Sequence, residues 1–121
     1  MSRRVLVIED GEDNRRIVRD LLTSVGYEII EAVTGEAGVS AAATHLPDLI
    51  LMDIQLPGLD GYEATRRIKA NPALRHIPII AVTSYALSGD DMKAFAAGCD
   101  AYVTKPFSPR ALLAKVREYL P

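Results

Sequence analysis

Five short apolar runs alternate with five amphipathic stretches along this chain of 121 residues. The apolar runs have the length and hydrophobicity of strands, and the amphipathic stretches have the spacing of helices with one apolar face. Such alternation is typical of βαβ units, which build a parallel sheet covered by helices on both faces. We therefore predict one α/β domain with three layers, a doubly wound (βα)5 fold. The strands are expected at 5–8, 27–31, 49–52, 77–83 and 101–104, with the second strand at an edge.

Capping side chains and glycines mark where the helices between these strands should begin and end. The second and third helices are expected at about 35–44 and 61–70. The fourth helix has a thin apolar face, for which the spacing indicates Met92, Phe95 and Ala96. The expected N-caps are Asp13 or Asn14 for the first helix, then Asp60, Ser88 and Ser108, and the expected stops include Gly26 and Gly98.

The composition is that of an ordinary globular domain, with 49% apolar and 25% charged residues. No apolar run is long enough for a signal sequence or a membrane span, so we expect a cytoplasmic protein without membrane association. The single cysteine, Cys99, is expected to be a small buried hydrophobe. A net charge of −2 with interspersed signs argues against direct DNA binding. The cluster of Arg15, Arg16 and Arg19 is expected either to be solvated or to contact a partner.

Polar side chains follow the carboxyl ends of four of the predicted strands. Crossovers between parallel strands bring all of these ends to one side of the sheet. In the flavodoxin-like strand order 2-1-3-4-5, which we expect here, the ligand crevice lies between the first and third strands. Strands are roughly 4.8 Å apart, so a lysine two strands from the crevice must cross roughly 10 Å. The side chains expected to meet there are Glu9, Asp10, Asp53, Thr83 and Lys105.

These residues indicate a phosphoryl acceptor that works with a divalent cation. Neighbouring carboxylates repel one another, and a set of hard oxygen ligands without His or Cys fits Mg²⁺, or Mn²⁺ as a substitute, better than Zn²⁺. We expect Asp53 to attack phosphorus, Lys105 to stabilise the transferring charge and Thr83 to donate to a phosphoryl oxygen. The expected metal ligands are Asp10, Asp53, the backbone carbonyl of Gln55, and Glu9 directly or through water.

Four sequence motifs follow one another with a characteristic order and spacing, at residues 7–10, 51–61, 82–84 and 102–107. Together they resemble the response regulator receiver domain of two-component signalling, in the CheY-like superfamily, and the resemblance covers all 121 residues. Within that family the chain is most similar to stand-alone bacterial regulators of the DivK type. One receiver domain over residues 1–121, without an output domain, is therefore expected.

The resemblance implies a phosphorelay switch rather than an enzyme. A histidine kinase or histidine phosphotransfer protein would donate the phosphoryl group to Asp53 in the presence of Mg²⁺. Thr83 would then be drawn toward the phosphoryl group and Tyr102, the switch aromatic, would rotate inward. The surface of helix 4, strand 5 and helix 5 would change and control a downstream signalling protein. The resemblance also implies a cis bond between Lys105 and Pro106, and Gln55 and Tyr85 occupy positions that influence phosphoryl lifetime.

Other functions fit the sequence less well. A haloacid-dehalogenase-type phosphatase needs a second Asp two residues after the nucleophile, where this chain has Gln55. A flavodoxin-like nucleotide binder needs phosphate-binding amides and hydroxyls in its first loop, which here is acidic. The strongest alternative is a constitutive docking module in which phosphorylation is incidental. We expect a monomer or a weak homodimer.

Overall fold

The computed structural model describes residues 3–84 and 90–121, which form one parallel five-stranded sheet in the order β2-β1-β3-β4-β5. The predicted fold class and strand order are therefore confirmed. The central strand β3 is buried at every position, as its apolar run predicted. The strands are β1 (Arg4–Ile8), β2 (Glu28–Ala32), β3 (Leu49–Asp53), β4 (Ile79–Thr83) and β5 (Ala101–Thr104).

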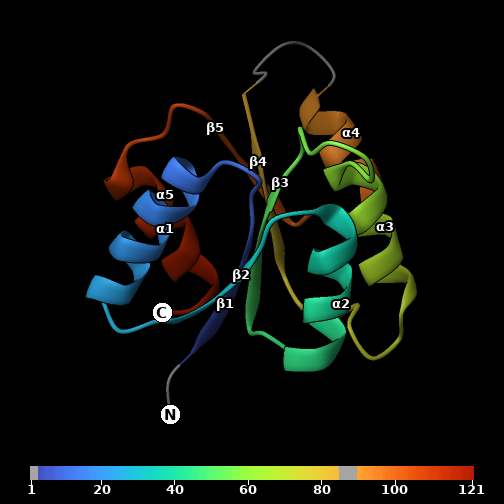
Figure 1. Cartoon of the computed structure of the whole chain (residues 1–121), viewed down its shortest axis with the longest axis horizontal. Helices are drawn as coiled ribbons and strands as arrows, with labels where there is room; N and C mark the ends of the chain where they lie inside the picture. Colours follow the sequence, from blue (N-terminus) through green and yellow to red (C-terminus); the bar gives the residue numbers. More distant parts are fainter. Residues whose placement is uncertain (1–2, 85–89) are drawn as a thin grey trace.

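Helices cover both faces of the sheet, which Figure 1 shows nearly edge-on. Alternate strand side chains form two separate cores, one on each face, because successive residues of a strand point in opposite directions. Cys99 is 5% exposed and belongs to the core that contains Ile50 and Ile68, which confirms the prediction that it is a buried hydrophobe. On one face lie α1 (Glu12–Ser24) and α5 (Pro109–Tyr119), and on the other α2 (Gly35–His45), α3 (Gly61–Ala70) and α4 (Asp90–Ala97).

The helices on which the site depends begin where side chains satisfy their first amides. Asp60 caps α3 by accepting a 2.9 Å hydrogen bond from the amide of Glu63. Ser108 caps α5 in the same way, through the amide of Ala111 at 3.0 Å. Both predicted caps are thus confirmed, whereas Ser88 lies outside the described residues.

The predicted cap of α1 is wrong. The helix begins at Glu12, with Gly11 as an extended N-cap residue that supplies no side-chain hydrogen bond. Asp13 lies inside the first turn, and its carboxylate binds the Arg16 guanidinium at 2.8 Å instead of a helix amide. Acidic side chains in the first turn favour this end of the helix through the macrodipole, so a capping side chain is not needed.

The predicted apolar face of α4 is also wrong. Met92 and Phe95 are 71% and 48% exposed, and Ala96 is exposed as well, whereas Ala94 and Ala97 are buried. The spacing i, i+3, i+4 correctly places Met92, Phe95 and Ala96 on one side of the helix. That side faces outward, however, and α4 packs against the protein through Ala94 and Ala97. Among the described residues, no helix combines the length and hydrophobicity needed to cross a membrane.

Candidate functional site

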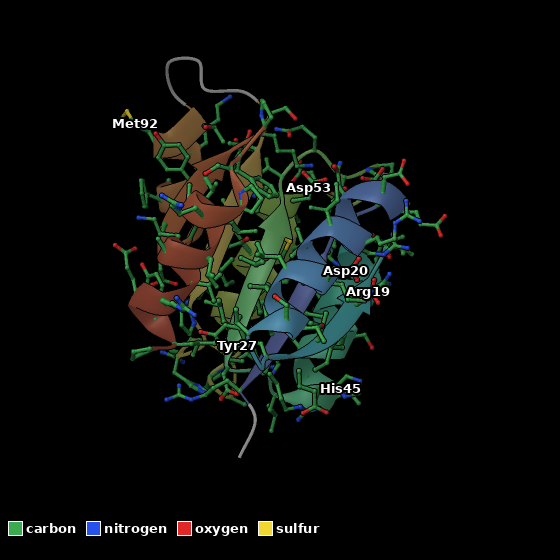
Figure 2. All side chains as sticks on the ribbon, turned by 90° about the vertical axis from the view of Figure 1, so that its left-hand side faces the viewer. Arg19, Asp20, Tyr27, His45, Asp53 and Met92 are labelled. Carbon is green, nitrogen blue, oxygen red and sulfur yellow. The ribbon has the colours of Figure 1, made fainter. Side chains whose placement is uncertain are left out.

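The functional side chains lie where the carboxyl ends of the strands meet at one edge of the sheet. Asp53 is the last residue of β3 and lies at the upper end of that strand in Figure 2. Glu9 follows β1, Thr83 ends β4 and Lys105 follows β5. Glu9, Asp53 and Thr83 are only 6%, 3% and 3% exposed, whereas Asp10 is exposed. The predicted convergence of these residues is confirmed.

The turn after β3 holds the Asp53 carboxylate in place. The backbone N–H of Gln55 donates a 3.1 Å hydrogen bond to Asp53 Oδ1, so the carboxylate is held by the loop that follows it. The chain then reverses through Gly58, whose φ of +73° favours glycine. It re-enters at Gly61, where a Cβ atom would lie 2.4 Å from the Asp53 carbonyl oxygen. Only glycine therefore permits α3 to begin this close to the end of β3.

Lys105 connects the two buried carboxylates. Its Nζ donates to Glu9 Oε1 at 2.6 Å and lies 3.5 Å from Asp53 Oδ2. The other Glu9 oxygen, Oε2, accepts a 2.9 Å hydrogen bond from the Gly11 amide. The reach of Lys105 across the sheet edge was predicted, and the Lys105–Pro106 bond that follows it is cis as expected.

The pKa values of this cluster depend on burial and on the position of Lys105, which lies closer to Glu9 than to Asp53. Burial, together with the neighbouring Glu9 carboxylate, raises the pKa of Asp53 from its ordinary 3.8 to about 6, against the opposing Lys105 charge. Burial also disfavours the charged form of Glu9, but hydrogen bonds from Lys105 and Gly11 outweigh it and lower the Glu9 pKa. For Lys105, burial is likewise outweighed by the hydrogen bond to Glu9 and the Asp53 charge, which raise its pKa.

The donor chemistry of the cluster fits a hard divalent cation. Glu9, Asp10 and Asp53 each offer a carboxylate oxygen, and these atoms lie within 4.8 Å of one another. Oxygen ligands without nitrogen or sulfur suit Mg²⁺ or Mn²⁺. With all three carboxylates ionised and one lysine between them, the cluster has a formal charge of −2, which a divalent cation would neutralise. The role predicted for the Gln55 backbone carbonyl stays a prediction.

Sequence reasoning missed the side chain of Gln55. Its Nε2 donates to Thr83 Oγ1 at 2.8 Å, and its Oε1 accepts from the Ser84 amide at 3.0 Å. Gln55 therefore ties the loop after β3 to the end of β4. The only sequence signal for this role was the position of Gln55 two residues after Asp53. Tyr85, the other residue expected to influence phosphoryl lifetime, lies outside the described residues.

Tyr102 lies away from the carboxylates, on β5. It is half-buried and pairs in register with Ala81 of β4. Its ring meets Phe95 of α4 edge-on, with centroids 6.0 Å apart and an interplanar angle of 81°. Tyr102 thus links β4, β5 and α4 and lines an open groove of about 540 Å³ on the α4–β5–α5 surface.

Comparison with known sequences supports the same interpretation as the geometry. The model of the response regulator receiver domain family matches residues 5–117. The polar-differentiation response regulators DivK of Brucella ovis and Brucella anthropi are each 43% identical over 120 residues, which cover 99% of this chain and 98% of theirs.

Solved structures of receiver domains share the fold of this chain. The receiver domain of the sensor histidine kinase PA1611 from Pseudomonas aeruginosa, which has a magnesium ion coordinated in its active-site cleft, is 37% identical with a TM-score of 0.92. The alignment covers 99% of this chain and 98% of that one. A putative response regulator from Chloroflexus aurantiacus is 29% identical with a TM-score of 0.94, over 99% of this chain and 98% of that one.

Proposed function

The chain belongs to the response regulator receiver domain family, the phosphoacceptor module of two-component signalling, and we propose that its phosphorylated residue is Asp53. One observation carries this assignment. Asp53 is the only carboxylate among the described residues that ends a central strand, is 3% exposed and lies beside a lysine shared with a second buried carboxylate.

Each neighbouring residue has a role in the transfer. An Asp53 carboxylate oxygen forms the new O–P bond while the P–N bond to the donor histidine breaks, and the imidazole takes back the electron pair of that bond. Lys105, already 3.5 Å from Asp53, moves from sharing two carboxylates to binding a phosphoryl oxygen. The Thr83 hydroxyl oxygen accepts a hydrogen bond from Gln55, and its proton would be donated to another phosphoryl oxygen.

Glu9, Asp10, Asp53 and the Gln55 carbonyl would hold the divalent cation. When bound, Mg²⁺ or Mn²⁺ would neutralise negative charge around the transferring group. Glu9 is held ready for this role by the Gly11 amide. The known Mg²⁺ in the PA1611 receiver domain supports the proposal.

The response is proposed to pass through Thr83 to Tyr102. Movement of Thr83 toward the phosphoryl group would empty space beside β5, and Tyr102 would rotate into it at the expense of its edge contact with Phe95. The altered α4–β5–α5 surface would then select a downstream signalling protein. The proposed donor is a histidine kinase or a histidine phosphotransfer protein.

Intact-protein mass spectrometry tests the phosphoacceptor directly. The protein is incubated with acetyl phosphate and Mg²⁺, Mn²⁺ or EDTA, beside Asp53→Asn and the surface control Asp20→Asn, whose native side chain is 72% exposed. We expect one added phosphoryl group with either cation in the native protein and in Asp20→Asn, and none in Asp53→Asn. No addition, even with a panel of phosphohistidine proteins, would refute the proposal and favour a constitutive docking module.

A further inference from the structure

Arg15 binds the backbone of the acidic loop, although it was expected to be solvated or to contact a partner. Its Nη1 donates to the carbonyl oxygens of Glu9 at 3.0 Å and Asp10 at 3.4 Å. Its Nε donates to Glu31 Oε1 on β2 at 3.2 Å. One planar guanidinium thus joins the edge strand to the two residues that supply candidate metal ligands.

The anchor for Arg15 is itself held from two sides. Arg19, labelled in Figure 2, lies one turn further along α1, and its Nη1 binds Glu31 Oε2 at 3.2 Å. Glu31 therefore lies between two arginines, which limits the positions its carboxylate can take. The Arg15 side chain is only 16% exposed, compared with 55% for Arg16, which pairs with Asp13.

We propose that Arg15 is the positioning residue of the metal site: anchored by Glu31, it holds the Glu9 and Asp10 carbonyls so that both carboxylates face Asp53. The Glu9 and Asp10 peptide groups leave β1 at the point where the ladder ends, and α1 begins only after Gly11. Without the guanidinium, these carbonyls would turn toward water, and the loop backbone that carries the Glu9 and Asp10 side chains would shift. The inference rests on the proposed function, because it concerns the cation site of that mechanism.

A positioning role and a purely electrostatic role predict opposite results. A guanidinium near a cation site repels the cation, so if Arg15 acted only through its charge, Arg15→Ala would strengthen Mg²⁺ binding and Arg15→Lys would leave it unchanged. If Arg15 positions the ligands, both variants weaken binding, because lysine keeps the charge but lacks the planar fork that reaches two carbonyls and a carboxylate together.

The test measures Mg²⁺ binding by isothermal titration calorimetry on unphosphorylated protein at a temperature where circular dichroism shows every variant folded. Loss of a residue that orients metal ligands typically lowers affinity 10- to 100-fold, so we expect Arg15→Ala to raise the Kd about 10-fold. Arg15→Lys and the anchor variant Glu31→Gln should each give a smaller increase. The matched control Arg16→Ala, one residue along the same helix, should leave the Kd unchanged.

A second readout separates positioning from general destabilisation. In phosphorylation by acetyl phosphate, the half-saturating Mg²⁺ concentration should rise with the Kd in Arg15→Ala, while the rate at saturating Mg²⁺ stays near that of the native protein. An unchanged or lower Kd in Arg15→Ala would overturn the inference, even if its melting temperature falls. Absence of Mg²⁺ binding by the native protein would instead overturn the proposed function.

Discussion

Replacing Asp53 by Asn is expected to stabilise the metal-free protein above pH 6, although it removes the proposed phosphoacceptor. The folded protein raises the pKa of Asp53 from 3.8 to about 6 through burial and the Glu9 charge. A carboxyl group that binds its proton more tightly when folded opposes folding once it ionises. A shift of about 2 pH units corresponds to a cost of about 3 kcal/mol.

The sign of this effect gives it a distinct pH window. Stability of the native protein falls as pH rises from about 3, where Asp53 is largely protonated in both states, to about 7.5, where it is ionised in both. Asn does not ionise, so the gain from Asp53→Asn should be about 0.5 kcal/mol at pH 4 and reach at most about 3 kcal/mol at pH 7.5. Lys105 does not lose its partner, because Glu9 remains 2.6 Å away.

Urea denaturation in EDTA between pH 4 and pH 8 measures this difference. The control Asp20→Asn removes an acid whose side chain is 72% exposed, and its effect should stay within about 0.5 kcal/mol at every pH. The reasoning is refuted if Asp53→Asn is equal to or less stable than the native protein at pH 7.5, or if its gain does not depend on pH.

Three further substitutions test the structure around the site. Gly61→Ala places a Cβ atom 2.4 Å from the Asp53 carbonyl, and should lower the free energy of unfolding by about 1–3 kcal/mol in urea titrations, whereas no loss would show that α3 can move away. Lys69→Met removes an ammonium that donates to two carbonyls and one carboxylate between α3, β4 and β5, and thermal unfolding should show a loss of about 2 kcal/mol. Gln55→Ala should expose the Ser84 amide and speed its hydrogen exchange about 10-fold, and unchanged exchange would contradict the observed hydrogen bond.

The fold and the convergence of the site could be predicted because both depend on backbone geometry. A continuous apolar run such as 49–52 indicates a strand covered on both faces, and parallel strands bring their carboxyl ends to one edge. Asp53 and Lys105 follow such runs directly, so their approach depends on strand order and on little else. Element ends were less predictable: strand β4 begins at Ile79 rather than at residue 77, because Pro78 accepts a hydrogen bond from the Ile50 amide but has no amide of its own to donate.

The sequence did not predict which face of a short helix is buried or which partners a long polar side chain binds. In α4, Met92 and Phe95 lie on one side and Ala94 and Ala97 on the other, and an eight-residue helix with both patterns can pack either way. The two alanines permit a closer approach than the larger side chains, and the helix adopts that packing. Long polar side chains pose the same difficulty, since Arg15 could reach solvent as easily as the carbonyls it binds.

The charge balance of the carboxylate cluster depends both on the backbone geometry, which could be predicted, and on the side-chain contacts, which could not. Lys105 cannot neutralise three carboxylates, and Arg15 of α1 is committed to backbone carbonyls and to Glu31. The metal-free protein therefore has to leave charge uncompensated, and it does so at the most buried carboxylate, Asp53, whose pKa rises to about 6. Phosphorylation would replace the single negative charge of the Asp53 carboxylate by an acyl phosphate with a charge of about −1.5 to −2, which Lys105 alone could not balance either. The proposed use of a divalent cation is therefore supported by how Arg15 is used, as much as by where the carboxylates lie.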